Sequence, residues 1–371
     1  MGSTTDAALW EKAGRHLVRY GHHFQPAIIA SAHGAFMTTT DGRRLLDFAS
    51  GQMSTILGHG HPEVTEVIRE QAGELVHLYS QLLSRPVIAL AEKLAEIAPG
   101  ALERVLLLST GGESNEAALR MAKTATGGHE VLALSRSWHG VTQGAASATY
   151  NSSRHGHGPA TPGSFVLPAP TPYRPRFTRG EAYDWEAELD YGFELYDRQS
   201  TGSPAALIIE SILSSGGVIV PPAGYLRAAA ERARRRGMLV IVDEAQTGLG
   251  RTGRLFDCTN DGVVPDFVTL SKTLGAGLAL SAVITTAEIE QRCFDRGFHF
   301  YTTHASDPLP AAVGLKVIEI ILRDRLADRA LAAGARLRAG FEAIMQRHEQ
   351  VGDVRGRGLL MGVELVKDRR G

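Results

Sequence analysis

Short apolar runs alternate with amphipathic segments from about residue 100 to residue 286. Several of these runs are continuously apolar, which is typical of strands buried on both faces of a largely parallel sheet. Between them, residues 113–128 gather small and apolar side chains on one helical face before a Gly-Gly stop, and residues 224–237 have the pattern of a second helix. The pattern therefore predicts an α/β fold with a doubly wound, or closely similar, sheet. Strands are expected at residues 104–110, 129–135, 205–211, 238–244, 266–272 and 280–286.

The remaining segments follow this pattern less clearly. Residues 151–203 are rich in Pro, Gly, Tyr and Arg and have weak periodicity, so we expect a long excursion over the surface. A helical stretch is expected after residue 308, and residues 358–366 have the pattern of a strand. Because no later strand is available to pair with that last segment, we expect the C-terminal domain to be incomplete in this chain.

Composition and charge exclude several classes of protein. The chain has 371 residues, of which 43% are hydrophobic and 21% are charged, and 39 basic residues nearly balance 40 acidic ones. A net charge of −1 gives no general attraction to nucleic acid or to a membrane surface. No apolar run approaches the ~18 residues of a transmembrane helix. The two cysteines, Cys258 and Cys293, have no paired spacing, which favours a cytoplasmic location over a disulfide framework.

Three polar features lie where predicted strands end. Thr110 and Glu113 fit a capping box, and the two glycines between them expose N–H groups that suit a phosphate, although a simple helix cap explains this stretch equally well. Asp243 ends a buried strand, where it can pair with a cationic heterocycle nitrogen, bind a metal or have a purely structural role. Lys272 ends the next strand, where a lysine either reaches water or has a chemical use.

Pyridoxal 5′-phosphate (PLP) fits all three features together. If the two strands are neighbours in one sheet, Asp243 and Lys272 lie at the same edge. Lys272 would then hold the cofactor as a Schiff base, Asp243 would keep its pyridine nitrogen protonated, and Gly111 and Gly112 would hold its phosphate. A Walker-type nucleotide site is excluded because the sequence contains neither GxxxxGKS nor GxxxxGKT.

Two longer motifs carry a family resemblance. The chain contains DEAQTGLGRTG at residues 243–253 and LSKTLGAGL at residues 270–278, and both are very similar to the signature of class III, fold type I, PLP-dependent aminotransferases. Within that class the chain most closely resembles the 2,2-dialkylglycine decarboxylases. The resemblance implies a large PLP-binding domain at residues 51–315. It also implies a smaller domain, formed by residues 1–50 and by the beginning of a C-terminal domain at residues 316–371.

The resemblance implies a role for each matching residue. Lys272 would be the Schiff-base lysine and the acid and base that moves the proton, and Gln52 would place the carboxylate that leaves as carbon dioxide. Trp138, which replaces the Phe or Tyr of most relatives, would stack on the cofactor ring. The implied cofactor contacts are Asp243 at the ring nitrogen, Gln246 at the phenolic oxygen, Trp138 and Ala245 on the two ring faces, and Thr110, Gly111, Gly112 and the partner subunit's Thr303 at the phosphate.

An ion, a partner and substrates are implied as well. The implied enzyme is a homodimer or a dimer of dimers that acts on small amino acids and keto acids, with no nucleic-acid or membrane partner. It would decarboxylate 2,2-dialkylglycines such as 2-methylalanine and transfer the amino group to pyruvate, giving carbon dioxide, a ketone and alanine. An alkali metal ion, K⁺ or Na⁺, would bind hard oxygen ligands, although turn chemistry explains the Ser and Thr equally well. The matching positions are Leu78, Ser80, Thr303, Ala305 and Asp307.

Two alternative functions stay open. A class III ω-aminotransferase would use the same cofactor residues without decarboxylation. A non-catalytic, cofactor-binding fragment would lack the substrate-binding arginine that the family carries in its C-terminal domain. Three positions also depart from the subfamily, because Ser211 replaces a proline, Val141 replaces a pocket methionine, and Ala98 replaces a threonine near a second ion site.

Overall fold

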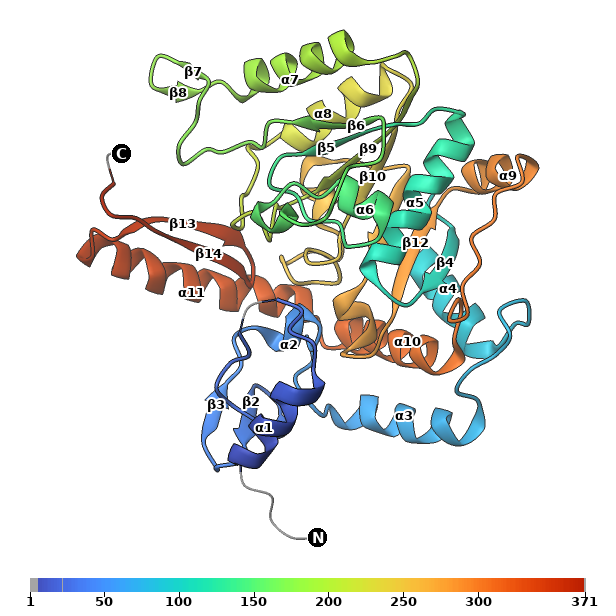
Figure 1. The fold of residues 1–371 in the computed structure, drawn as a ribbon, viewed down its shortest axis with the longest axis vertical. Helices are drawn as coiled ribbons and strands as arrows, with labels where there is room; N and C mark the ends of the chain where they lie inside the picture. The colour runs from blue at the N-terminus through green and yellow to red at the C-terminus, as the bar shows by residue number, and fades with distance from the viewer. Residues whose placement is uncertain (1–5, 22, 370–371) are drawn as a thin grey trace.

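A seven-stranded sheet forms the centre of the protein. The computed structural model describes residues 6–21 and 23–369, so residues 1–5 and 370–371 of the predicted terminal segments lie outside the described part. All strands of the sheet run parallel except β12, which is antiparallel to both of its neighbours. The predicted α/β fold with a largely parallel sheet is confirmed (Figure 1). In spatial order the strands are β4 (Arg104–Leu108), β12 (Ser281–Thr285), β11 (Phe267–Leu270), β10 (Leu239–Asp243), β9 (Pro204–Glu210), β5 (Glu130–Leu134) and β6 (Ser164–Leu167).

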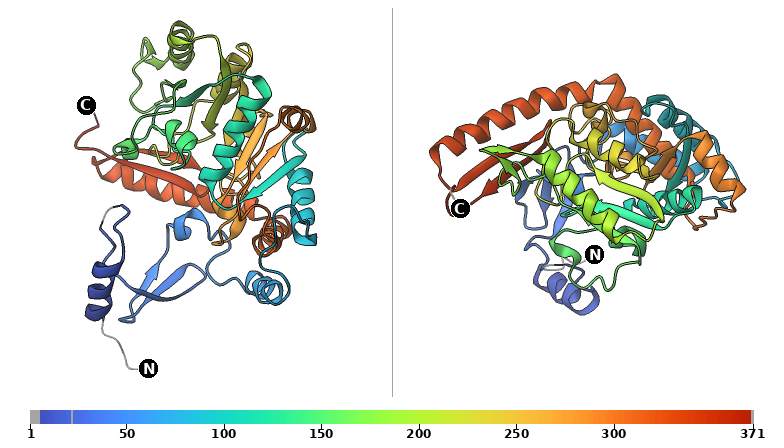
Figure 2. Two further views of the ribbon diagram at one scale, coloured as in Figure 1. Left: turned by 45° about the vertical axis from the view of Figure 1, so that its right-hand side comes forward. Right: turned by 90° about the horizontal axis from the view of Figure 1, so that it is seen from above.

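Helices cover both faces of this sheet, as Figure 2 shows. Neighbouring side chains along a strand pack on opposite faces, so that Ile208 and Ile209 of β9 belong to different core clusters. This arrangement explains why the strands are continuously apolar in sequence. One face packs against α5 (Gly111–Thr126) and α9 (Ala287–Asp295). The other packs against α4 (Arg85–Ile97), α7 (Trp185–Gln199), α8 (Tyr225–Arg234) and α10 (Pro308–Arg323).

The N-terminal segment lies beside the turn that follows β11. A three-stranded antiparallel sheet follows the first helix, and the short helix after it contacts η3 (Lys272–Gly275), where Thr273 Oγ1 donates to the Met53 carbonyl at 3.5 Å. The segment thus reaches the turn that begins at Lys272. Its elements are α1 (Asp6–His16), β1 (Ile29–His33), β2 (Phe36–Thr39), β3 (Arg44–Leu46), α2 (Ser50–Met53) and α3 (Pro62–Glu74).

The C-terminal segment corrects one prediction. The sequence predicts a strand at residues 358–366 without a partner. In the structure this strand, β14 (Leu360–Leu365), pairs antiparallel with β13 (Val351–Arg357), which immediately precedes it. Glycines and charged residues interrupt the apolar pattern of VGDVRGR, so no strand was expected there. The hairpin packs on α11 (Leu326–Arg347), and α10 runs unbroken across the predicted domain boundary after residue 315.

The prediction for residues 151–203 is wrong in part. Instead of one surface excursion, this stretch supplies the edge strand β6 and the 15-residue helix α7. Leu189, Phe193 and Tyr196 of α7 are buried, and their i, i+4, i+7 spacing is a helical signal that the Pro- and Gly-rich surroundings obscured. The excursion is confined to the connections, where the small hairpin β7 (Thr178–Arg179) and β8 (Ala182–Tyr183) projects beyond α7 in Figure 1.

Among residues 6–21 and 23–369, no helix is both long enough and apolar enough to cross a bilayer.

Candidate active site

A cavity of about 340 Å³ opens at the carboxyl ends of the central strands. Ligands bind at this edge in open α/β sheets. The start of α5, the loop after β5 and the ends of β9, β10 and β11 all contribute to the lining. Eight of the nine predicted cofactor residues line it together, namely Thr110, Gly111, Gly112, Trp138, Asp243, Ala245, Gln246 and Lys272.

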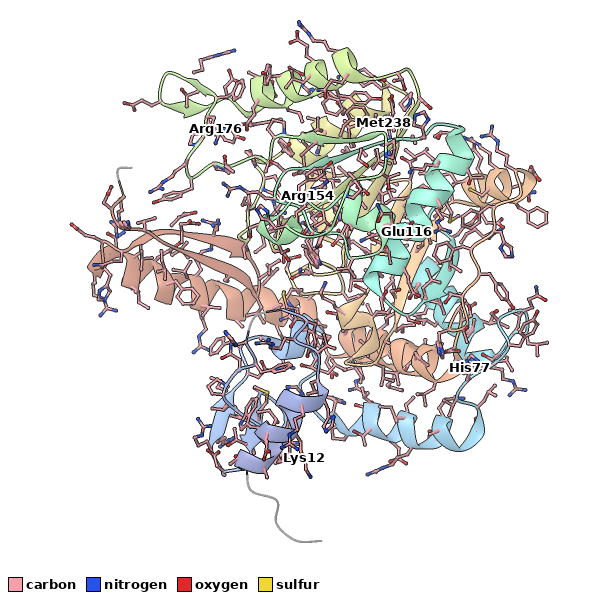
Figure 3. All side chains as sticks on the ribbon, viewed as in Figure 1. Lys12, His77, Glu116, Arg154, Arg176 and Met238 are labelled. Atoms are coloured by element: carbon pink, nitrogen blue, oxygen red, sulfur yellow. The ribbon has the colours of Figure 1, made fainter. Side chains whose placement is uncertain are left out.

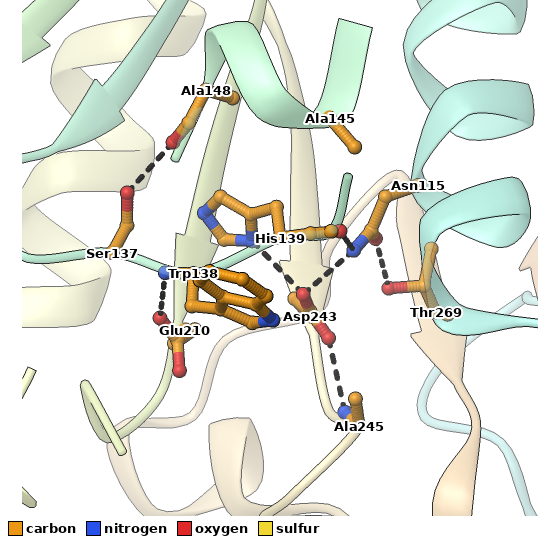
Figure 4. A network of polar contacts seen from close by, with 12 residues as sticks. Asn115, Ser137, Trp138, His139, Ala145, Ala148, Glu210, Asp243, Ala245 and Thr269 are labelled. Carbon is orange, nitrogen blue, oxygen red and sulfur yellow. Dashed lines mark hydrogen bonds and ion pairs between the residues drawn. The ribbon is translucent and has the colours of Figure 1, made fainter. Parts of the chain in front are cut away.

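Asp243 is the centre of a buried polar network (Figure 4). Its Oδ2 accepts from Asn115 Nδ2 at 2.8 Å and contacts His139 Nδ1 at 2.9 Å, while its Oδ1 accepts from the backbone N–H of Ala245 at 3.0 Å. Asn115 is fixed in turn, because its Oδ1 accepts from Thr269 Oγ1 at 2.7 Å. The carboxylate therefore has a single orientation at the base of the cavity.

The electrostatics of Asp243 favour the ionised form. Burial by itself would raise the pKa of this carboxyl, but the hydrogen bond and charge of His139, the charge of Lys272 and the Ala245 N–H hold the pKa below its usual value. A buried carboxylate that stays charged needs a cationic or hydrogen-bond-donating partner. Asp243 can thus hold a proton on a basic ring nitrogen.

Lys272 follows β11 in a strained turn. It has a positive φ of 44°, which is unusual for a residue with a long side chain. Such conformations cluster at functional sites, where the surroundings fix them. Among the described residues, no acid lies within ion-pair distance of the Lys272 amine, and Lys272 lines the cavity.

The start of α5 forms a backbone cradle. Thr110 and Glu113 make both hydrogen bonds of the predicted capping box, at 3.3 Å and 2.9 Å, so the capping reading is confirmed. Gly140, with a φ of 130°, lies so close that a Cβ there would be 2.6 Å from Gly112 Cα. The helix N-terminus lines the cavity with N–H groups and a positive dipole, an arrangement that suits a phosphate.

Trp138 is held by a buried acid. Its backbone N–H donates to Glu210 Oε1 at 2.9 Å, and Glu210 Oε2 accepts from the Ser214 N–H at 3.2 Å. Burial raises the pKa of Glu210 to about 7. The indole contacts the ring of His157 edge-on, with centroids 6.4 Å apart, and lines the cavity.

Comparison with known proteins identifies the family. A model of the class-III aminotransferase family matches residues 18–371. The chain belongs to the class-III aminotransferases. It is therefore a PLP-dependent aminotransferase of fold type I, and the donor set fits PLP, with a lysine that lines the cavity, a charged buried carboxylate and a glycine-lined helix start.

Relatives and solved structures agree with this assignment. An uncharacterized aminotransferase of Schizosaccharomyces pombe is 52% identical over 96% of this chain and 80% of its own length. An acetylornithine aminotransferase of Mycobacterium tuberculosis is 34% identical over 98% of this chain and 85% of its own. A thermostable (S)-enantioselective ω-transaminase from Thermomicrobium roseum superposes with a TM-score of 0.92 at 34% identity, covering 99% of this chain and 86% of that one.

One solved structure contains the cofactor. A taurine:2-oxoglutarate aminotransferase from Bifidobacterium kashiwanohense, in complex with PLP and glutamate, superposes with a TM-score of 0.92 at 28% identity. The comparison covers 100% of this chain and 85% of that chain.

Two predicted residues of the aminotransferase site lie outside the cavity. Gln52 is exposed on α2, and Thr303 is exposed in the loop before α10. Neither belongs to the described residues that line the cavity. Thr303 was expected to act on the partner subunit's cofactor, whereas Gln52 was expected to reach the substrate.

The predicted ion ligands come from two segments that lie side by side. His77 Nδ1 is 2.6 Å from Asp307 Oδ1, and the rings of Tyr79 and Tyr301 are 6.5 Å apart. Leu78 and Ser80 therefore lie near the 301–307 loop. Both oxygens of Asp307 already contact imidazoles, because His304 Nδ1 is 2.7 Å from Oδ2.

Sequence reasoning missed several residues that support the aminotransferase site. Asn115, Thr269 and Glu210 fix Asp243 and Trp138 but were not singled out. A polar Asn115 on the otherwise apolar face of α5 was a usable signal, because Asn is unfavourable inside a helix unless its side chain has a use. Glu244, the second acid of DEAQTG, is buried and turned away from the cavity, where its Oε1 accepts from the Cys258 N–H at 2.8 Å.

Proposed function

We propose that this aminotransferase decarboxylates 2,2-dialkylglycines and transfers their amino group to a keto acid. With 2-methylalanine and pyruvate the products are carbon dioxide, acetone and alanine, and all atoms balance. The single observation that carries the cofactor chemistry is the joint presence of Asp243 and Lys272 in one cavity. The decarboxylation itself rests on the resemblance of the motifs, including Trp138 and Gln52.

Lys272 and Asp243 have complementary tasks in this proposal. When bound, PLP supplies an aldehyde that captures the substrate amine and a ring that accepts the electron pair released at Cα. Asp243 would hold the proton on the ring nitrogen, and Asn115 and His139 hold Asp243 in place. Lys272 would hold the cofactor between turnovers and move a proton during amino transfer.

Other residues orient the reactants. The N–H groups of Gly111 and Gly112 would hold the phosphate at the start of α5, and Gln246 would bond the phenolic oxygen. Trp138 and Ala245 would hold the two faces of the ring. Gln52 would select the bond that breaks by binding the substrate carboxylate.

The proposal for Gln52 is supported by the position of α2. Thr273 Oγ1 in the turn after Lys272 donates to the Met53 carbonyl, next to Gln52 in sequence. Gly51 has a φ of 65°, which breaks the helix there. The proposed role requires the Gln52 amide to reach the substrate from this turn.

A second candidate is ω-amino transfer without decarboxylation. It is favoured by the solved structures that resemble this chain, several of which are ω-transaminases. Both candidates use the same cofactor residues. In decarboxylation the bond between Cα and the carboxylate breaks. In amino transfer without decarboxylation the bond between Cα and hydrogen breaks.

Release of carbon dioxide separates the two candidates. Purified protein loaded with PLP receives 2-methylalanine and pyruvate, and carbon dioxide and alanine are measured together. The proposal predicts equal amounts of both products. Alanine formation from a primary ω-amine and pyruvate, with no carbon dioxide from 2-methylalanine, would replace the proposal by the second candidate.

We propose further that the enzyme is a homodimer with shared sites and binds an alkali metal ion. The proposed partner contact is Thr303, which is exposed and lies outside its own cavity, in a region that also exposes Tyr79, Leu83 and Tyr301. The proposed ion ligands are oxygens of Leu78, Ser80, Thr303, Ala305 and Asp307. Equilibrium sedimentation, and PLP retention in K⁺ against a choline buffer, test these two points.

A further inference from the structure

A closed turn follows β9, whose last residue, Glu210, lines the cofactor cavity. The turn comprises residues 214–218, and its ends are joined because Leu213 and Ile219 exchange two backbone hydrogen bonds, at 3.0 Å and 3.1 Å. Within it Val218 has a positive φ of 53°, which is a genuine outlier for a β-branched residue. Such a conformation persists only where the surrounding structure fixes it. The turn therefore needs an outside contact that holds its shape.

The turn contacts two parts of the cavity wall. The Ser214 N–H donates to Glu210 Oε2 at 3.2 Å, and Glu210 Oε1 accepts from the Trp138 N–H. Ser215 Oγ accepts from Gln246 Nε2 at 3.4 Å. A side-chain amide nitrogen has two N–H groups, so the second N–H of Gln246 is available to the cavity that this residue lines. The position of the turn thus bears on both Trp138 and Gln246.

Arg355 fastens this turn from a distant part of the chain. It lies on β13, and its Nε donates to the Gly217 carbonyl at 2.8 Å. The other two guanidinium nitrogens donate to Asp353 and Glu364 of the same hairpin. The Arg355 side chain is only 17% exposed. Figure 3 shows the hairpin on α11, at the side of the molecule and to the left of the central sheet. A single side chain therefore joins the turn after β9 to this outer hairpin.

Glycines allow the hairpin and the turn to pack closely. A Cβ on Gly217 would be 3.3 Å from Arg355 Nη2. On β14, a Cβ on Gly362 would be 2.9 Å from Val218 Cβ. The hairpin therefore fixes the part of the turn that contains the strained Val218.

We propose that Arg355 is a positioning residue of the aminotransferase site. By holding the Gly217 carbonyl, it keeps Ser215 where it accepts from Gln246, so that the other N–H of the amide is directed at the phenolic oxygen of the cofactor. This role rests on the proposed contact between Gln246 and that oxygen. A hydrogen bond there stabilises negative charge on the oxygen and so tunes the electronics of the ring. Without Arg355 the turn relaxes, and the amide loses its fixed direction.

The absorbance of the bound cofactor tests this role. The full chain loaded with PLP is compared as wild type, Arg355→Gln, Gln246→Ala and the variant with both substitutions. Gln246→Ala is expected to change the PLP absorbance spectrum, and Arg355→Gln is expected to give the same change with at least about half its amplitude. The double variant is expected to match Gln246→Ala alone, because Arg355 acts through Gln246. A merely structural role of Arg355 would add a second effect in the double variant.

Ser215→Ala tests the same link without disturbing the hairpin. Ser215 is exposed, so its replacement leaves the core intact but removes the acceptor for Gln246. The spectral change expected in Ser215→Ala is the one expected in Arg355→Gln. Melting curves check the fold of each variant.

A second measurement needs no cofactor. Hydrogen exchange of the peptide that contains residues 213–219 is followed in cofactor-free protein, where Arg355→Gln is expected to raise the exchange rate by at least ~10-fold. Arg338→Gln is the matched control, because Arg338 donates to the carbonyls of Val354 and Gly356 on β13 rather than to the turn. Exchange of the same peptide in this control should stay within about threefold of the wild-type rate.

The outcomes separate the role of Arg355 from the proposed function. An unchanged spectrum in Gln246→Ala would contradict the proposed contact with the phenolic oxygen, and the role of Arg355 with it. A changed spectrum in Gln246→Ala, together with a wild-type spectrum in Arg355→Gln or in Ser215→Ala, would overturn the role of Arg355 alone. Additive spectral changes in the double variant, unchanged exchange in Arg355→Gln, or equally fast exchange in Arg338→Gln would overturn it as well.

Discussion

Asp243 and Lys272 meet at one cavity because they follow neighbouring parallel strands. Asp243 ends β10 and pairs in register with Thr269 of β11, and Lys272 begins the turn that follows that strand. An acid that stays ionised and a lysine without an ionic partner thus line the same cavity.

Removing the charge of Asp243 should greatly slow amino transfer without unfolding the protein. Asp243→Asn keeps the size of the side chain but cannot hold a proton on the ring nitrogen. We expect the turnover number for alanine formation to fall by ~10³-fold, with PLP still bound. The measurement is steady-state turnover at saturating substrate, together with the PLP content of the purified variant.

The neighbouring acid provides the matched control. Glu244 is equally buried, but its carboxyl contacts Thr247 and the Cys258 N–H rather than the cavity. Glu244→Gln should keep turnover within about tenfold of the wild-type value. An equal loss in both variants would assign the effect to general disruption of the DEAQTG turn.

The sequence predicted that Asp243 and Lys272 lie at the same edge of the sheet, and both line one cavity. The end of a buried strand is a costly place for a charge, so Asp243 and Lys272 were visible as exceptions in apolar runs. Asn115 and Glu210 were not visible in the same way. Their importance arises from hydrogen bonds to Asp243 and to the Trp138 backbone, which join residues 128 and 72 positions apart. No local pattern contains such contacts.

Gly140 should be intolerant of a side chain. A Cβ at this position would be 2.6 Å from Gly112 Cα, and its φ of 130° disfavours any other residue. We expect Gly140→Ala to lower the free energy of unfolding by about 3 kcal/mol. The measurement is urea unfolding of the cofactor-free protein.

Gly112, which lies against Gly140, serves as the control. A Cβ at Gly112 would have its nearest neighbours at 3.6 Å, which is ordinary contact. Gly112→Ala should therefore leave the free energy of unfolding unchanged, or raise it by up to ~1 kcal/mol through helix propensity. Equal destabilisation by both substitutions would contradict the close approach of the two segments.

Buried Glu244 should make stability depend on pH. Burial raises its pKa from the ordinary 4.5 to about 7, so the folded protein binds more protons than the unfolded chain between these values. The contribution of Glu244 to the free energy of unfolding is then largest below pH 4.5 and is lost as the pH rises to 7. The full loss is about 3 kcal/mol.

The variant Glu244→Gln isolates this contribution. Glutamine resembles the protonated acid and does not titrate. The variant should therefore become more stable relative to the wild type, in free energy of unfolding, as the pH rises from 5 to 8. Urea unfolding at both pH values measures the shift. A constant difference would mean that Glu244 ionises normally in the folded protein.

Gln52 should act on the decarboxylation of the amino acid and not on the transfer of the amino group to the keto acid. Gln52→Ala is expected to lower carbon dioxide release from 2-methylalanine by ~10²-fold, because the leaving carboxylate loses its positioning donor. Amino exchange between alanine and labelled pyruvate should stay within about tenfold, since it breaks a bond to hydrogen instead. A parallel loss in both assays would give Gln52 a general role in binding.

The peripheral segments were harder to predict than the site. β13 pairs with β14 although its sequence is rich in glycine and charge, because α11 and the ion pair between Arg357 and Asp257 hold it in place. α7 was missed although Leu189, Phe193 and Tyr196 have helical spacing. In both cases tertiary packing decides the structure, and the local pattern carries only part of the information.

Borohydride trapping identifies the lysine that holds the cofactor. The protein is loaded with PLP, the bond between lysine and cofactor is reduced with borohydride, and the digested peptides are analysed by mass spectrometry. We predict the cofactor mass on the peptide that contains Lys272 and no such mass in Lys272→Ala. The cofactor on another lysine, or an unchanged label in that variant, would contradict it.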